Sequence, residues 1–399
     1  MKRIFDDFTL QYELIRTMGH VAFDGADIGE CLETAGKIDE SDRESWYWEW
    51  RKTAELNKRN ADDCLNNGNI VSARTAYLRA SNYYRTAEFF LRDKNELETA
   101  IETARMSSYS FEKACKLFQP EYKRIQIPFE KSYLPGYYFK ANYTNVKKPT
   151  IIAMTGYDGT AEELYFNIGA AGIARGYNVL TFDGPGQGMA LREQKLPFRP
   201  DWEKVVTQVV DYLIEKEEVD ADRIAMIGYS MGGYLVARAA AFEHRIVACI
   251  ANSGIYSFFD GIMGEKAHSP EFLRMLDKEN AQEFNAGIRQ MTKGNLSTWW
   301  KIQNGLFTFQ IKTPQELMNA YRAYTLEDCV NNISCPVLIC DSQEEHFLGN
   351  QAHILFDKLK CKKEFMYFTK EEGASLHCQC GAEKLSGNRI LDWLDNLLK

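Results

Sequence analysis

The sequence predicts an α/β fold, in which a mostly parallel sheet follows a helical N-terminal region and is interrupted by a helical lid. Residues 1–120 repeat apolar side chains at helical spacing. After Pro120, short apolar runs bounded by turn residues alternate with helix-period segments, the pattern of β-α-β units. We therefore expect a helical N-terminal domain at 1–120, a core at 121–255 and 329–399, and an inserted lid at 256–328.

The helical prediction for the first 120 residues depends on one stripe of side chains at three- and four-residue steps. Its members are Ala73, Ala76, Ala80, Tyr84, Ala87 and Leu91. Flanking helices are expected at 44–66 and 95–118, where Gly and Pro are scarce. Trp46, Trp48 and Trp50 offer large apolar area to the helical core, to the lid or to a second copy of the chain, and their burial would discriminate among these.

The core prediction depends on apolar runs that are too short for helices. The expected strands lie at 125–127, 137–139, 151–154, 179–182, 224–227, 247–251, 336–340 and 365–368, the first two forming a hairpin around Leu134-Pro135-Gly136. Residues 205–214 have helical spacing. The interval from Tyr256 to Asp328 holds about 75 helical and aromatic residues between two strands, far more than a simple connection needs.

Composition excludes several classes of function. With 45% hydrophobic and 26% charged residues the chain is typical of a globular protein, and a net charge of −8 argues against a nucleic-acid partner. Apart from Cys378-Gln379-Cys380, the ten cysteines lack paired metal-type spacing, so we expect free thiols in a reducing compartment. No metal or organic cofactor is expected. No segment has the length and apolarity of a signal or a membrane span, which predicts a cytoplasmic protein without a membrane partner.

The sharpest motif is Gly228-Tyr229-Ser230-Met231-Gly232-Gly233, which lies between a predicted strand and a predicted helix. This is the context of a nucleophile elbow, where the serine occupies a strained turn and small residues two positions away avoid collisions with the backbone. Ser230 is therefore the candidate nucleophile. Serine is a poor nucleophile near neutral pH, so it needs a general base within hydrogen-bond reach.

Order along the chain selects the base from six histidines. In this architecture the base follows the last strand, and only His377 lies in such a loop, before the amphipathic final helix. The acid that orients it should follow the strand at 336–340, where Asp341, Glu344 and Glu345 compete. A few residues of loop are usually needed to reach back to the base. This favours Glu345, with Asp341 as second choice.

An oxyanion requires two backbone donors, one from the residue after the nucleophile and one from the loop after an earlier strand. Met231 and Tyr157 occupy those places, and Gly156 would allow close approach of the backbone. The loop at 183–188 is expected to be scaffolding near the site. In the lid, Trp299, Trp300, Phe307 and Tyr321 are candidates for an apolar substrate pocket.

Together these motifs resemble the α/β-hydrolase superfamily, and almost the whole chain resembles its subgroup with a helical N-terminal domain. That subgroup includes FrsA-like esterases, Ayg1-type polyketide-shortening hydrolases and 2,6-dihydroxypseudooxynicotine hydrolase. Residues 344–351 and 371–379 are similar to its acid and histidine loops, which supports Glu345 and His377. The family usually has aspartate where Glu345 stands, so the resemblance leaves Asp341 open as an alternative.

The resemblance implies an α/β-hydrolase fold and a serine hydrolase that acts through an acyl-enzyme. Members cleave carbon–carbon bonds next to ketones, esters or amides, and the aromatic lid favours a small, bulky, apolar carbonyl compound. We expect C–C hydrolysis of a β-diketone or polyketide-type substrate, or ester hydrolysis. Acyl transfer or peptidase activity with the same triad, and a non-catalytic binding protein on this fold, are the alternatives. A homodimer is expected from the resemblance and from the tryptophan cluster.

Overall fold

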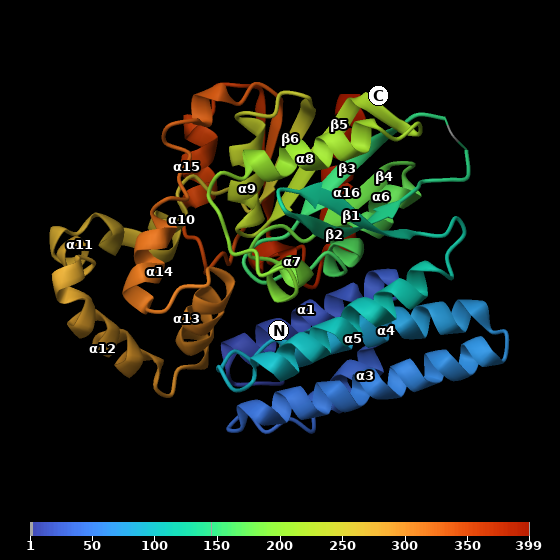
Figure 1. The fold of residues 1–399 in the computed structure, drawn as a ribbon, viewed down its shortest axis with the longest axis horizontal. Helices are drawn as coiled ribbons and strands as arrows, with labels where there is room; N and C mark the ends of the chain where they lie inside the picture. The colour runs from blue at the N-terminus through green and yellow to red at the C-terminus, as the bar shows by residue number, and fades with distance from the viewer. Residues whose placement is uncertain (1–2, 145, 399) are drawn as a thin grey trace.

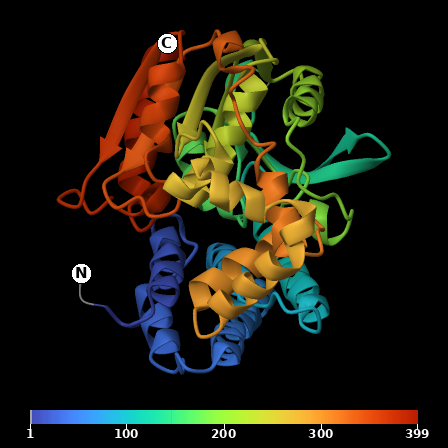
Figure 2. The same ribbon diagram turned by 90° about the vertical axis from the view of Figure 1, so that its left-hand side faces the viewer.

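A computed structural model describes residues 3–144 and 146–398 of the chain (Figure 1). A central sheet with flanking helices forms one part, and the N-terminal helices lie along one side of it. The lid helices extend beside both (Figures 1 and 2). Within the described residues, no helix is long and apolar enough to cross a membrane.

The N-terminal part is a group of helices packed around aromatic side chains. Its helices are α1 (Phe8–Gly19), α2 (Ile28–Ala35), α3 (Arg43–Asn66), α4 (Ile70–Glu88) and α5 (Leu97–Cys115). Asp7 caps α1, because its carboxylate accepts the Thr9 N–H at 2.7 Å. Trp46 and Trp50, one turn apart on α3, are 1% and 0% exposed in the core of this part, whereas Trp48 is 50% exposed. Two of the three tryptophans therefore stabilise the helices themselves.

The sheet has the order β1-β2-β4-β3-β5-β6-β7-β8 among the described residues. Its strands are β1 (Lys123–Phe129), β2 (Ser132–Phe139), β3 (Lys148–Met154), β4 (Asn178–Phe182), β5 (Val219–Tyr229), β6 (Ile246–Asn252), β7 (Val337–Ser342) and β8 (Lys363–Phe368). The β1–β2 and β2–β4 pairs are antiparallel, and every other pair is parallel. The α/β-hydrolase fold expected from the sequence is confirmed.

The predicted hairpin turn is wrong by several residues. Phe129 pairs with Ser132, so the turn lies at 130–131, and Leu134-Pro135-Gly136 is inside β2. A side chain on Gly136 would lie 2.4 Å from the Thr181 carbonyl oxygen of β4. Glycine therefore permits close contact between two strands here. In the sequence, a glycine used in this way looks the same as one that marks a turn.

The two faces of the sheet bury alternate residues of each strand. In β3, Ile152 and Met154 belong to the core under α8 (Glu203–Ile214) and α9 (Gly232–Ala240). Ile151 and Ala153 face the opposite core, which is covered by α16 (Glu383–Leu398) and by parts of α4 and α5. Shorter helices complete the core: α6 (Ala170–Ala174), α7 (Gly188–Arg192) and α15 (Gln351–Lys358).

The segment between β6 and β7 is helical, as the sequence predicts. It contains α10 (Phe258–Met263), α11 (Pro270–Met275), α12 (Ala281–Thr292), α13 (Leu296–Thr308) and α14 (Pro314–Tyr321). In Figure 2 these yellow and orange helices lie in front of the sheet and reach the blue N-terminal helices. The Trp300 ring of α13 stacks on Phe89 of the N-terminal part, with ring centroids 4.4 Å apart. The lid therefore contacts both other parts of the molecule.

Candidate active site

Ser230 lies in a tight turn between β5 and α9. Its backbone has a φ of +58°, a conformation that costs energy for a residue with a side chain. The surrounding glycines are required by space, because a side chain on Gly228 would lie 2.1 Å from the Gly232 carbonyl oxygen. A side chain on Gly232 would lie 2.8 Å from the Thr155 carbonyl oxygen. The sequence thus holds the Ser230 side chain on a rigid turn at the carboxyl edge of the sheet.

His377 and Glu345 complete a continuous hydrogen-bonded chain with Ser230. The His377 Nε2 atom lies 2.9 Å from the Ser230 Oγ, and the His377 Nδ1 atom lies 2.5 Å from the Glu345 Oε2. The imidazole is buried. The other carboxylate oxygen of Glu345 accepts the backbone N–H groups of Phe347 and Leu348 at 2.8 and 3.2 Å. These contacts fix the carboxylate, and the carboxylate in turn orients the imidazole.

Asp341, the second candidate for the acid, is placed differently. It is buried directly at the end of β7, where one carboxylate oxygen accepts the Ser342 N–H at 2.9 Å. Its other oxygen is 3.8 Å from the Nε2 of His353. The structure brings Glu345 to His377 and leaves Asp341 beside a different histidine.

The charges at this site shift its titration. Burial alone would lower the pKa of His377, but the adjacent Cys378 sulfur and the Glu345 carboxylate outweigh it and raise the pKa well above its ordinary value. Burial would raise the pKa of Glu345, yet His377 and the Phe347 N–H hold it at about 2. Burial raises the pKa of Asp341 to about 6. Glu345 is therefore the carboxylate that is ionised near neutral pH beside His377.

The loop Gly156-Tyr157-Asp158 follows β3 and lies against the elbow. A side chain on Gly156 would lie 2.6 Å from the Met231 backbone nitrogen. The Gln187 amide of the 183–188 loop donates to the Thr155 and Gly156 carbonyls at 2.7 and 3.2 Å. In a trans peptide the C=O and the next N–H point in opposite directions, so the Tyr157 N–H is directed away from Gln187.

Lid residues hold the same loop from the other side. The Asn304 amide donates to the Tyr157 carbonyl at 3.1 Å. The Tyr157 hydroxyl donates to the Lys301 carbonyl at 2.8 Å and is 2.6 Å from the Tyr321 hydroxyl. The loop conformation therefore depends on where the lid packs.

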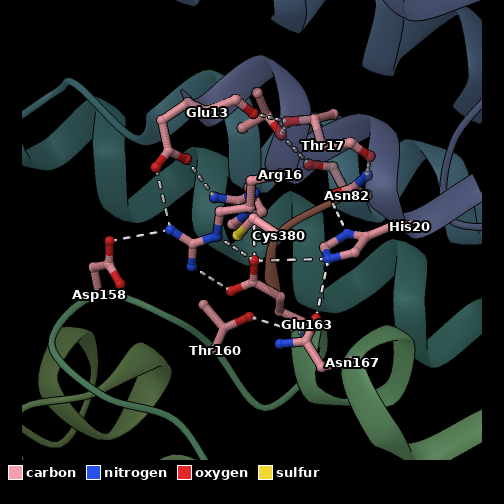
Figure 3. A network of polar contacts seen from close by, with 12 residues as sticks. Glu13, Arg16, Thr17, His20, Asn82, Asp158, Thr160, Glu163, Asn167 and Cys380 are labelled. Carbon is pink, nitrogen blue, oxygen red and sulfur yellow. Dashed lines mark hydrogen bonds and ion pairs between the residues drawn. The ribbon is translucent and has the colours of Figure 1, made fainter. Parts of the chain in front are cut away.

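The N-terminal helices reach the loop through a buried ionic network (Figure 3). The Arg16 guanidinium of α1 makes two 2.6 Å hydrogen bonds to the Glu163 carboxylate and one of 3.1 Å to Asp158. Glu13 lies 3.4 Å from the same guanidinium and 3.3 Å from Arg85 of α4. Because Asp158 follows Tyr157 directly, Arg16 connects α1 to the candidate oxyanion loop.

A cavity of about 430 Å³ opens above Ser230, and Ser230 and His377 both line it. Of the four lid residues proposed from sequence, Trp300 and Tyr321 belong to its wall. The other two lie elsewhere among the described residues, and for them the pocket prediction is wrong. Trp299 packs under the Arg43 guanidinium at 4.3 Å. Phe307 lies beneath Arg92 and Arg192, whose guanidinium carbons are 5.6 and 5.8 Å from its ring centroid.

Several cavity residues escaped the sequence reasoning. Phe8, Tyr12 and Arg16 come from α1 at four-residue steps, so they lie on one helical face, and that spacing is the signal that could have found them.

The sulfur of Cys378 lies 3.2 Å from the Ser230 nitrogen and 3.4 Å from His377 Nε2. Within the described part of the chain, no three His, Cys, Asp or Glu side chains gather as a metal site.

Comparison with known proteins shows the family to which the chain belongs. The family model described as Esterase FrsA-like matches residues 40–317. Hydrolase LUC6 of a Fusarium species is 34% identical over 412 residues, spanning 99% of this chain and 98% of its own. The 20-hydroxy-prefusarin hydrolase FUS2 of Gibberella moniliformis is 33% identical, with 99% and 98% covered.

Among solved structures, that of 2,6-dihydroxy-pseudo-oxynicotine hydrolase aligns with a TM-score of 0.73 over 95% of both chains. Its sequence identity is 19%, so this likeness concerns the fold. The family model and the curated relatives align with most of the chain and are named as esterases or hydrolases, so they also indicate the class of activity. The chain belongs to the FrsA-like esterase family and is a hydrolase of the α/β-hydrolase type.

Proposed function

We propose that the chain is a serine hydrolase that forms an acyl-enzyme with a small, bulky, largely apolar carbonyl compound. The bond cleaved is a C–C bond of a β-diketone or polyketide-type substrate, or an ester. The observation that carries the proposal is the chain of contacts from Ser230 Oγ through His377 to Glu345, with distances of 2.9 and 2.5 Å, at the wall of a cavity. A volume of about 430 Å³ suits a compact organic molecule.

The mechanism starts with His377. As general base it takes the Ser230 proton through Nε2, and the Ser230 oxygen attacks the substrate carbonyl. Glu345 accepts the Nδ1–H and stabilises the imidazolium that forms. The backbone N–H groups of Tyr157 and Met231 are the proposed donors to the tetrahedral oxyanion. The fixed loop carbonyls and the closeness of Gly156 to the Met231 nitrogen support that assignment.

Collapse of the tetrahedral intermediate expels the leaving group. His377, now protonated, gives its proton to the leaving alcohol or to the carbon of a leaving enolate. Water then attacks the acyl-enzyme with His377 again as base, and release of the acid restores Ser230. The C–C and ester reactions differ only in the atom that His377 protonates, so one site serves both. Two similar proteins carry names that specify a compound, 20-hydroxy-prefusarin and 2,6-dihydroxy-pseudo-oxynicotine, which supports a small-molecule substrate.

Intact-mass spectrometry after treatment with a fluorophosphonate tests the proposal. We expect one adduct on the wild type and none on Ser230→Ala or His377→Ala. Ser297→Ala is the matched control, because Ser297 lines the same cavity and no hydrogen bond joins it to a histidine among the described residues. Loss of the adduct in the Ser297 variant, or an unlabelled wild type with intact circular dichroism, would refute the assignment. Matched esters and β-diketones then identify the bond that is cleaved.

A further inference from the structure

Charged residues on two walls of the cavity differ in their partners. On the wall formed by α1 and the loop after β3, Glu13, Asp158 and Glu163 contact Arg16, and Glu13 and Glu163 also contact Arg85. On that wall each carboxylate that contacts Arg16 has an arginine partner, while a further buried carboxyl, Glu383 of α16, also lines the cavity, where burial raises its pKa to about 7. On the lid wall, Lys266 and Lys301 have no carboxylate within 4 Å in residues 3–144 and 146–398. The cavity therefore contains cationic groups that the described chain leaves without counter-ions.

Lys301 differs from Lys266 in burial. Lys266 is exposed, whereas Lys301 on α13 is partly buried, and burial lowers the pKa of Lys301 below its ordinary value. An ammonium has three donors, and no acceptor contacts the Lys301 Nζ atom in the described part of the protein. The Lys301 ammonium lies over the Phe347 ring, 4.8 Å from its centroid. A ring contact offsets part of the desolvation cost and satisfies none of the three N–H donors.

The position of Lys301 is fixed relative to the catalytic candidates. Its backbone carbonyl accepts the Tyr157 hydroxyl at 2.8 Å, so α13 is attached to the loop that carries the proposed oxyanion donor. The Phe347 ring that Lys301 covers packs edge-on against His377, with ring centroids 4.9 Å apart. One aromatic ring therefore separates the ammonium from the base. Ser230 and Lys301 line the same cavity, so a substrate that presents its carbonyl to Ser230 can also place a polar group beside Lys301.

We propose that Lys301 forms an anion-binding subsite and that the natural substrate of this cavity carries a carboxylate or a comparably acidic enol. The proposal rests on the proposed hydrolase function and adds a substrate class to it. Such an anion replaces water lost from a partly buried ammonium and makes a charge-assisted hydrogen bond in a desolvated site. The apolar remainder of the substrate occupies the aromatic part of the wall, which includes Trp300 and Phe258.

Two pairs of chromogenic or chromatographically resolved esters test the proposal without knowledge of the natural substrate. The first pair places charge on the acyl side: 4-nitrophenyl hydrogen glutarate and 4-nitrophenyl pentanoate. The second places it on the leaving group: the hexanoyl esters of 4-hydroxybenzoate and of 4-hydroxybenzamide. For each pair, the ratio of kcat/KM for the charged member to that for the neutral member is measured in the wild type, Lys301→Met, Lys301→Arg and Lys266→Met.

The expected result is a ratio of about 10 or more in one pair for the wild type, the range of a charge-assisted hydrogen bond. Lys301→Met should reduce this ratio to about 1, Lys301→Arg should retain most of it, and Lys266→Met should leave it unchanged. The main-chain contact to Tyr157 survives each substitution at Lys301, and melting temperatures verify folding. The proposal would be overturned if neither pair shows a charge preference in the wild type. It would also be overturned if the preference survives Lys301→Met, or if Lys266→Met lowers the kcat/KM ratio. If the wild type cleaves no member, and no fluorophosphonate adduct forms, the hydrolase assignment itself has failed.

Discussion

Replacing Arg16 with methionine tests whether the N-terminal helices stabilise the active-site loop. The guanidinium is 12% exposed and Glu163 is 4% exposed, so their paired 2.6 Å hydrogen bonds are largely shielded from water. The substitution would leave Glu13 and Glu163 with Arg85 as their arginine partner and would remove the ion pair of Asp158. Removing one partner of such a buried pair costs about 3–5 kcal/mol, because the remaining charge stays desolvated. We expect a loss of that size in the free energy of unfolding near neutral pH.

The loss should depend on pH in a defined direction. Burial would raise the pKa of Glu163, but Arg16 and Arg85 outweigh it and hold the pKa well below its ordinary value. A carboxylate with a depressed folded-state pKa stabilises the fold fully above its unfolded pKa of about 4.3, and the contribution disappears as the pH falls through the folded pKa. Without Arg16 this contribution is smaller, because only Arg85 remains of the two arginines, and buried carboxylates that lack a partner oppose folding until they are protonated. The difference between wild type and Arg16→Met should therefore be largest near pH 7 and shrink below about pH 4.3.

Urea unfolding followed by circular dichroism, at several pH values, measures this difference. Arg43→Met is the matched control, because Arg43 also contacts a carboxylate, Glu96, with two bonds of 2.8 Å. Arg43 is 24% exposed, and its described ion pairs, with Asp93 and Glu96, do not involve the 156–158 loop, so its loss should be smaller. A loss below about 1 kcal/mol for Arg16→Met, or one that is equal at acidic and neutral pH, would contradict the calculation from the buried pair.

Three further predictions concern the reacting groups. Glu345→Gln should lower kcat by about 10²-fold or more, because the imidazolium loses its counter-ion. Asp341→Asn should retain most of the activity. Steady-state kinetics on a neutral ester compare the two variants. The wild-type kcat/KM should rise with pH, because His377 must be neutral to act as base, and should level off above an apparent pKa higher than the ordinary 6.5. Glu345→Gln should move the midpoint of this profile to lower pH. Gly156→Ala should nearly abolish labelling by a fluorophosphonate, because the alanine methyl would lie 2.6 Å from the Met231 nitrogen. In the control Gly287→Ala the new methyl meets no atom within 4 Å, so this variant should raise the melting temperature slightly.

The sheet and the positions of its strands along the chain were accessible from sequence because each strand is a short apolar run bounded by turn residues. The elbow was accessible for a stricter reason, since only glycine fits at 228 and 232 around Ser230. Chain order then limited the histidine to one loop. Each of these inferences uses constraints that act over a few residues or that the topology fixes.

The cavity wall was not accessible in the same way. Helical spacing shows that Phe8, Tyr12 and Arg16 share one face of α1, but not which surface that face meets. The same limit explains Trp299 and Phe307, whose aromatic rings found arginine partners outside the cavity. The lining of a pocket between helices from different parts of the chain depends on the angles at which those helices pack. The spacing of residues in a single sequence does not give those angles.

Support for the oxyanion loop comes from all three parts of the molecule, and this constrains how specificity can change. Arg16 of the N-terminal helices contacts Asp158, Asn304 of the lid donates to the Tyr157 carbonyl, and Gln187 of the core donates to the Gly156 carbonyl. The lid thus forms the substrate wall and also holds the backbone that we propose to bind the oxyanion. A lid substitution that shifts α13 should change kcat together with KM, because a displacement near 1 Å at such a donor costs about 10²-fold in rate. Substitutions confined to cavity side chains, with the Asn304 contact intact, should change KM and selectivity alone.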